Sequence, residues 1–170
     1  MARLEWSEAL ALDLPLMDDT HQEFVELLKS VEEADDAGLV AAWTALVDHT
    51  DGHFAQEDRW MEATRFASSN CHSLQHKVVL QVMREGTQRA EQGELQVLRG
   101  MAAELAVWFP QHAQSMDAAL ALHLRRVGYH AATGQVHAPG ALPADLIHGC
   151  GGACSSGDEA EHEPRAVVAA

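Results

Sequence analysis

The stretch DHTDGHFAQEDRWM, Asp48–Met61, combines a helical apolar pattern with two groups that can bind a metal ion. His53 and Glu57 are four residues apart, and side chains at this spacing lie about 40° apart around a helix, so both can share one face. Apolar Phe54 and Trp60 lie beside them. Exposed helices also carry such pairs by chance. The meaning of this pair therefore depends on whether other segments supply partners.

The spacing of apolar residues on both sides of this stretch predicts four helices. They are expected between a cap at Asp18 or Asp19 and an end at Gly38, from about Val40 to Thr64, from a cap at Ser69 or Asn70 to Gly93, and from about Glu94 to Gly128. The connections are short, so consecutive helices should be antiparallel. The predicted fold is all-α: an up-down-up-down four-helix bundle with an N-terminal arm and a flexible C-terminal tail.

A change in composition near residue 131 predicts the domain boundary. Residues 1–131 are expected to form the bundle. Residues 132–170 contain five acids, one base and a glycine cluster, and they are expected to be a disordered acidic tail. The tail includes HGCGGAC, His148–Cys154, in which Cys150 and Cys154 could bind a soft metal or form a redox disulfide. Unstructured thiols are the default interpretation of this weak signal.

The formal net charge of -15 makes nucleic acid and anionic membrane surfaces poor candidate partners. Small neutral ligands and cations remain. The N-terminus lacks a basic start followed by an apolar run, and no segment approaches the ~20 apolar residues of a membrane-spanning helix. The cytoplasm is therefore the expected compartment. A protein partner and an oligomeric state cannot be derived from the sequence.

The other three predicted helices all supply partners for His53 and Glu57. In an antiparallel bundle, the start of the first and third helices lies at the same end as the later half of the second and fourth. The candidate metal ligands at that end are His21, His53, Glu57, His72, His76, His112 and Asp117. Without a metal, each such buried polar group would cost about 1–3 kcal/mol if left unsatisfied. The set as a whole predicts a metal centre.

Seven donors exceed the four that a structural zinc ion usually takes, and two carboxylates can each bridge two ions. Two metal ions therefore fit better than one. Imidazole and carboxylate ligands suit iron, zinc, copper or manganese, so the spacing alone leaves the element open.

Four motifs over roughly residues 4–128 resemble those of the hemerythrin family. They are Asp18-x-x-His21, His53-Phe54-x-x-Glu57, His72-x-x-x-His76 and His112-x-x-x-x-Asp117. The resemblance implies two iron ions bridged by Glu57, Asp117 and an oxo or hydroxo group. It implies that His72, His76 and His112 complete one iron. His21 and His53 would hold the other and leave it a vacant position for dioxygen.

The function expected from this resemblance is reversible dioxygen binding by a non-haem di-iron protein, for storage, delivery or sensing. An imidazole-rich, cationic centre favours binding over oxidative chemistry. The alternative is a di-iron enzyme of the peroxidase, nitric-oxide-handling or iron-donor type, so enzymatic activity stays open but is not favoured. A third possibility, a purely structural metal, is disfavoured because a vacant coordination position serves no structural role. The spacing places Trp6, Leu28, Phe54 and Trp108 around the dioxygen pocket.

Two further features of the sequence lead to expectations of their own. His112 and Asp117 are five residues apart and differ by about 140° on a regular helix, so we expect a kink or a π-like turn near Pro110. His49 lies one turn before His53 and could be an extra ligand or a proton shuttle, although a histidine at the bundle seam is the preferred interpretation. Four other histidines, His123, His130, His137 and His162, are expected at the surface.

Overall fold

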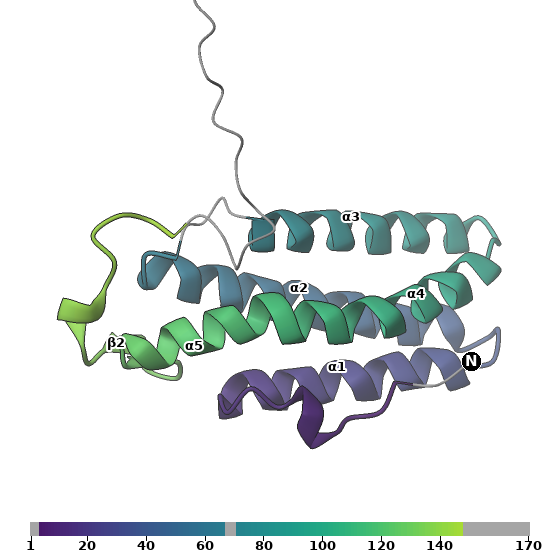
Figure 1. The fold of residues 1–170 in the computed structure, drawn as a ribbon. Helices are drawn as coiled ribbons and strands as arrows, with labels where there is room; N and C mark the ends of the chain where they lie inside the picture. Colours follow the sequence, from purple (N-terminus) through teal and green to yellow (C-terminus); the bar gives the residue numbers. More distant parts are fainter. Residues whose placement is uncertain (1–3, 67–70, 148–170) are drawn as a thin grey trace, which may run out of the picture.

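The computed structural model describes residues 4–66 and 71–147, and these form the predicted four-helix bundle (Figure 1). The first three helices are α1 (Pro15–Glu33), α2 (Leu39–Ala63) and α3 (Cys71–Glu91). The fourth is interrupted: it consists of α4 (Gln96–His112), the π turn η2 (Ala113–Asp117) and α5 (Ala118–Arg126). Each helix packs against its neighbours in the chain, and α1 also packs against α4, which closes the bundle. Before α1 runs the predicted N-terminal arm, which includes the short helix η1 (Glu8–Leu10).

Both ends of α1 differ from the sequence prediction. The helix begins at Pro15, whose fixed φ suits the first helical position, and not after a cap at Asp18 or Asp19. The Asp18 carboxylate lies inside the first turn and accepts hydrogen bonds from the backbone N–H groups of Leu12 at 2.7 Å and Leu14 at 3.1 Å. α1 ends at Glu33, well before Gly38, which instead directly precedes α2.

The later boundaries agree better with the sequence. The expected cap of α3 at Ser69 or Asn70 lies outside the described residues. Gly93 has φ +94 and follows α3, where the Glu94 N–H donates to the Arg89 carbonyl at 3.1 Å, a common helix ending that needs a left-handed residue. Gly128, with φ +62, follows the last helix as expected.

The apolar core is divided into two clusters. The larger includes Phe24, Leu28, Trp43, Leu46 and Phe109. The smaller one is made of Met17, Trp60, Met61, Phe66, Leu120, Ala121 and Leu124. On α1 and α2 the candidate ligands lie between residues of the two clusters, as His21 lies between Met17 and Phe24 on α1. A layer of polar groups thus separates two apolar regions.

After the bundle, residues 129–147 have defined structure. The strands β1 (Tyr129–His130) and β2 (Gln135–Val136) pair in an antiparallel hairpin, followed by the short helix η3 (Pro139–Ala141). Ile147 then forms a parallel bridge with Phe66 and packs against the smaller core cluster. Residues 132–147 therefore differ from the expected disorder, because backbone pairing in the hairpin and the contacts of Ile147 with the bundle give them defined positions. The rest of the predicted tail, 148–170, lies outside the described residues.

Among the described residues, no helix is long and apolar enough to cross a membrane.

Candidate metal centre

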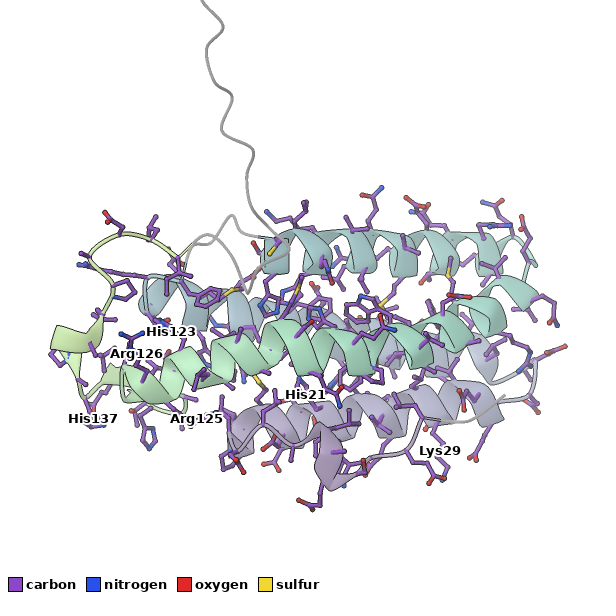
Figure 2. All side chains as sticks on the ribbon, in the orientation of Figure 1. His21, Lys29, His123, Arg125, Arg126 and His137 are labelled. Carbon is purple, nitrogen blue, oxygen red and sulfur yellow. The ribbon has the colours of Figure 1, made fainter. Side chains whose placement is uncertain are left out.

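All seven predicted ligands meet in the interior of the bundle. His21 comes from α1, His53 and Glu57 from α2, His72 and His76 from α3, His112 from the end of α4, and Asp117 from η2. Each is at most 4% exposed. Figure 2 labels His21 on the side of α1 that faces the fourth helix. The sequence reasoning therefore placed all seven residues at the correct level of the bundle.

The Glu57 carboxylate contacts imidazoles on both of its sides. Its Oε1 lies 3.3 Å from Nε2 of His53, whereas its Oε2 lies 3.1 Å from Nε2 of His72 and 3.4 Å from Nε2 of His76. One oxygen thus faces an imidazole of its own helix, and the other faces the pair on α3.

Asp117 has the same two-sided arrangement. Its Oδ2 lies 3.2 Å from Nε2 of His21, and its Oδ1 lies 2.9 Å from Nε2 of His72 and 3.1 Å from Nε2 of His112. In all five histidines the Nε2 atom faces one of these two carboxylates. The two carboxylates therefore divide the imidazoles into the same two sets.

The donor atoms of these sets form two overlapping groups. Within each group, all donor atoms lie within 4.8 Å of one another. One group contains the five donors Glu57, His72, His76, His112 and Asp117; the other contains the four donors His21, His53, Glu57 and Asp117. Glu57 and Asp117 belong to both. The arrangement can hold two cations that share two carboxylates, and the second position has one protein donor fewer than the first.

The polar atoms of the cluster are not satisfied by the protein itself. Among the described residues, no partner has acceptable hydrogen-bond geometry toward either oxygen of Glu57 or Asp117, although imidazole nitrogens lie close by. The Nε2 atoms of His76 and His112 face each other at 3.3 Å. Buried carboxylates without hydrogen bonds are costly, and bound cations would relieve this cost. The donor set thus fits metal ions.

Electrostatics keep the two carboxylates ionised. Burial and the nearby Asp117 charge oppose ionisation of Glu57, but His53, His72 and His76 outweigh them and lower its pKa to about 2. Burial likewise opposes ionisation of Asp117, but contact with His112, His21 and His72 holds its pKa well below 3.8. Both groups are therefore available as anionic ligands at neutral pH.

Three of the imidazoles have shifted pKa values, and the shifts go in both directions. Burial lowers the pKa of His53 to about 4, so this side chain is neutral near pH 7. Burial also opposes the charge of His21 and His76, but contact of His21 with Asp117, and of His76 with Asp58 and Glu57, raises both pKa values above 6.5. Metal binding must therefore displace protons from some of the imidazoles.

The π turn η2 explains how His112 and Asp117 reach the same cluster, and it confirms the expected irregularity after Pro110. In a π turn the backbone hydrogen bond runs to the residue five positions away, so residues five apart come close to one face. Nε2 of His112 and Oδ1 of Asp117 are then only 3.1 Å apart.

Two outer contacts were missed by the sequence reasoning. Nδ1 of His112 lies 3.2 Å from Oε1 of Gln75, a contact that orients the ring with Nε2 toward the cluster. Oδ1 of Asp58 lies 3.5 Å from Nδ1 of His76. Both contacts join different helices, so sequence spacing carries no signal for them.

His49 contacts the site only from outside. Its Nε2 lies 3.1 Å from the Thr20 carbonyl, and its ring lies parallel to that of His53, with centroids 6.4 Å apart. It belongs to neither donor group, in agreement with a histidine at the seam. His123 was expected at the surface, but it is buried and its Nε2 lies 2.9 Å from the Thr64 carbonyl.

The expected pocket residues are divided between the two donor groups. Phe54 stacks on His76 with centroids 3.9 Å apart, and Trp108 stacks on His112 at 4.5 Å, so both lie beside the five-donor group. Beside the four-donor group, the ring of Phe109 lies 5.1 Å from that of His21. Phe109 also stacks on Phe24 at 4.5 Å, in the core cluster that contains Leu28. The spacing of residues identified the inward face but not these neighbours across helices.

Comparisons with a family model and with known proteins both found matches to this chain. The family model described as "Hemerythrin HHE cation binding domain" matches residues 12–122, a range that contains all seven residues. A bacteriohemerythrin of Ralstonia nicotianae is 39% identical over 128 residues, which cover 75% of this chain and 93% of that protein. A bacteriohemerythrin of Pseudomonas aeruginosa is 28% identical over 122 residues, covering 69% of this chain and 79% of that protein. No solved structure matched the chain.

Proposed function

Because the chain belongs to the hemerythrin family, we propose that it is a non-haem di-iron protein that binds dioxygen reversibly. In this proposal His72, His76 and His112 would hold one iron, and His21 and His53 would hold the other. Glu57 and Asp117 would serve as ligands common to both positions. The metal-binding domain is the bundle, residues 1–131.

The observation that carries the proposal is the division of each carboxylate between the two sets of imidazoles. Oδ2 of Asp117 faces His21 while its Oδ1 faces His72 and His112, and Glu57 repeats this pattern with His53 on one side. A single ion would require only one of these sets. Two shared anionic ligands among nine donor places favour two adjacent cations.

The inequality of the two groups supports an external ligand at one of them. The four-donor group of His21, His53 and the shared carboxylates leaves more room for coordination than the five-donor group. When bound, the iron pair would supply the reversible electron transfer that dioxygen binding of this kind requires. The protein's part is to present neutral Nε2 atoms and to keep the position dry.

Exclusion of water is the role of the apolar groups beside His21. Phe24, Leu28 and Phe109 are each at most 2% exposed, and Phe109 contacts the His21 ring directly. A dry, apolar environment disfavours delivery of protons to a bound ligand, which favours release of dioxygen over its further reduction. These features support a carrier or sensor more than an oxidative enzyme.

The test is an absorption spectrum of the reduced, iron-loaded protein in cycles of air and argon, with iron content measured in parallel. Two iron ions per chain, and visible bands that appear in air and disappear under argon, are expected. Bands that form once and persist under argon would contradict reversible binding. A protein loaded with two irons but without any response to air would limit the metal to a structural role.

The cellular compartment and the use of the bound dioxygen are also proposals. We place the protein in the cytoplasm, as the sequence analysis expects, with dioxygen as the ligand and no nucleic-acid partner. Fractionation of the source cells tests the compartment. Whether dioxygen is stored, delivered or sensed is decided by its affinity relative to the cellular concentration, which the same spectra measure.

A further inference from the structure

We propose that the groove between α3 and α4 binds a small amphipathic cation, a molecule with an apolar body and one ammonium group. This would be a binding site on the outside of the bundle, and it does not depend on which metal or ligand the centre binds. The two helices pack side by side (Figure 1). Between them lies a cavity of about 460 Å³, within the range of about 300–1,000 Å³ that is common for small-molecule sites.

The walls of the groove are almost entirely apolar. They include Val78, Val82 and Met83 of α3, and Met101, Leu105 and Trp108 of α4. Val78 and Val82 are 54% and 44% exposed, whereas Met83 and Leu105 are buried. Single exposed valines are common on protein surfaces, but these two border a cavity that also reaches buried apolar residues. An apolar body in the groove would remove this exposed surface from water, which is favourable.

Two glycines show where the helices are in close contact and where space is left. At Gly86 of α3, an added Cβ would lie only 2.5 Å from Sδ of Met101, so α4 packs closely against α3 there. At Gly100 of α4, which lines the groove, an added Cβ would meet nothing within 4 Å. The space above Gly100 is therefore open, and a larger side chain at this position would occupy part of the groove.

Glu104 is the one charged residue among those that line the groove. Its side chain is exposed and has no hydrogen bond or ion pair with any residue in 4–66 or 71–147. The residues three and four positions away on α4 are uncharged: Gly100, Met101, Val107 and Trp108. The carboxylate thus lies at an apolar groove without a cationic partner, and an ammonium group on a ligand would supply one.

Charge decides which apolar molecules fit this groove best. An anionic head group would be repelled by Glu104 and by the net charge of -15 of the whole chain. A neutral molecule would gain only the burial of its apolar body. Because ion pairs at exposed sites are weak, we expect an ammonium group to improve the affinity by about threefold to fivefold.

The test is titration calorimetry of the full, iron-loaded chain with three probes that share one alkyl chain: octylamine, 1-octanol and octanoate. Octylamine should bind at one site per chain, about threefold to fivefold more tightly than 1-octanol, and octanoate should bind most weakly. Added salt should weaken the binding of octylamine but not that of 1-octanol, because salt screens the ion pair alone. Equal affinities for the three probes would overturn the proposal, because binding would then depend on the apolar body only.

Two variants locate the site. Glu104→Gln should lower the affinity for octylamine to that for 1-octanol and leave 1-octanol binding unchanged. Gly100→Leu should abolish the binding of both, because its side chain fills the groove. Gly52→Leu on α2 is the matched control, since Gly52 is also exposed and an added Cβ there would also meet nothing within 4 Å. Leucine has a higher helix propensity than glycine, so neither leucine variant should have a lower melting temperature.

The same variants define the results that contradict the proposal. Octylamine binding that survives Gly100→Leu, or that is lost equally in Gly52→Leu, would place the probe outside the groove and overturn it. Sedimentation of the unmodified chain over a range of concentrations tests whether a second copy covers the groove instead. A dimer that Gly100→Leu abolishes would overturn the small-molecule site in favour of a contact between copies, whereas a monomer that binds octylamine supports it.

Discussion

Oδ2 of Asp117 lies 3.2 Å from Nε2 of His21 and joins the fourth helix to the first across the buried interior. The other oxygen of the same carboxylate faces His72 on α3 at 2.9 Å. One side chain thus contacts candidate ligands of two other helices. The metal centre and the packing of the bundle are therefore expected to depend on each other.

Replacement of Glu57 should remove metal, whereas replacement of His49 should not. Glu57→Gln keeps the size of the side chain but loses the charge shared by the two donor groups, so iron content should fall from two per chain to one or none. His49→Ala is the matched control on α2, because His49 contacts the site only by stacking on His53. Iron analysis of both variants decides the point. If His49→Ala lost iron and Glu57→Gln did not, the candidate ligands on α2 would have to be reassigned one helical turn earlier.

Removal of metal should loosen the whole bundle. A ligand present at about 1,000 times its dissociation constant stabilises the folded state by about 4 kcal/mol. For a chain of this size, that corresponds to a melting temperature higher by on the order of 10 °C. Calorimetry of the iron-loaded and chelator-treated protein measures the difference, and Glu57→Gln should show little response to iron. Equal melting temperatures would mean that the seven residues do not share a site.

Metal affinity should decrease as the pH falls from 8 to 6. The pKa values of His21 and His76 are raised above the ordinary 6.5 in the metal-free protein, so protons compete with metal for both imidazoles more strongly than for an ordinary histidine. His53, with a pKa of about 4, is already neutral and should contribute nothing there. Two competing protons would weaken binding by up to about a hundredfold per pH unit. Competition with a chelator at several pH values measures this slope, and a flat profile would contradict the assignment of both imidazoles.

A polar group in the core beside His21 should shorten the time over which dioxygen binding stays reversible. Leu28→Thr introduces a hydroxyl into the cluster formed with Phe24 and Phe109 and should admit water. We expect the reversible absorption change to be lost on the order of ten times faster, equivalent to about 1.4 kcal/mol of protection. Val31→Thr, farther along α1 in the same cluster, is the control for a general loss of stability. Equal rates in both variants would show that the effect is not local.

Peroxide turnover separates the carrier from the enzyme. Among the described residues, Phe109, His53 and Asp117 contact His21. Asp117 is held ionised by its histidine neighbours, and burial lowers the pKa of His53 to about 4 so that it is neutral near pH 7, which makes both poor proton donors. We expect the iron-loaded protein to turn over peroxide at well below about 1 s⁻¹ with common electron donors. Steady-state kinetics with excess peroxide provide the measurement. Faster turnover would favour the peroxidase-type alternative.

The sequence predicted the convergence of the seven candidate ligands better than it predicted the helix boundaries. The candidate ligands could be found because helical spacing gives the inward face, and antiparallel order gives the level along the bundle. The position of Asp18 inside the first turn depends on two backbone hydrogen bonds that no periodicity reveals. His123 is buried because it meets the Thr64 carbonyl from another segment. The ordered residues 132–147 were missed for the same reason: their partners, such as Phe66 for Ile147, are far away in the sequence.

The π turn η2 has a consequence for the second half of the fourth helix. Because the turn contains one additional residue, everything after it is rotated by about 100° relative to an uninterrupted α-helix. Leu120 and Leu124 are completely buried in the orientation that this rotation gives them. Deleting one residue from 113–116 would restore a regular helix but direct both leucines toward a different side of the bundle. The backbone irregularity that brings Asp117 to His112 thus also sets the rotational register of the smaller apolar cluster, so that neither can change without the other.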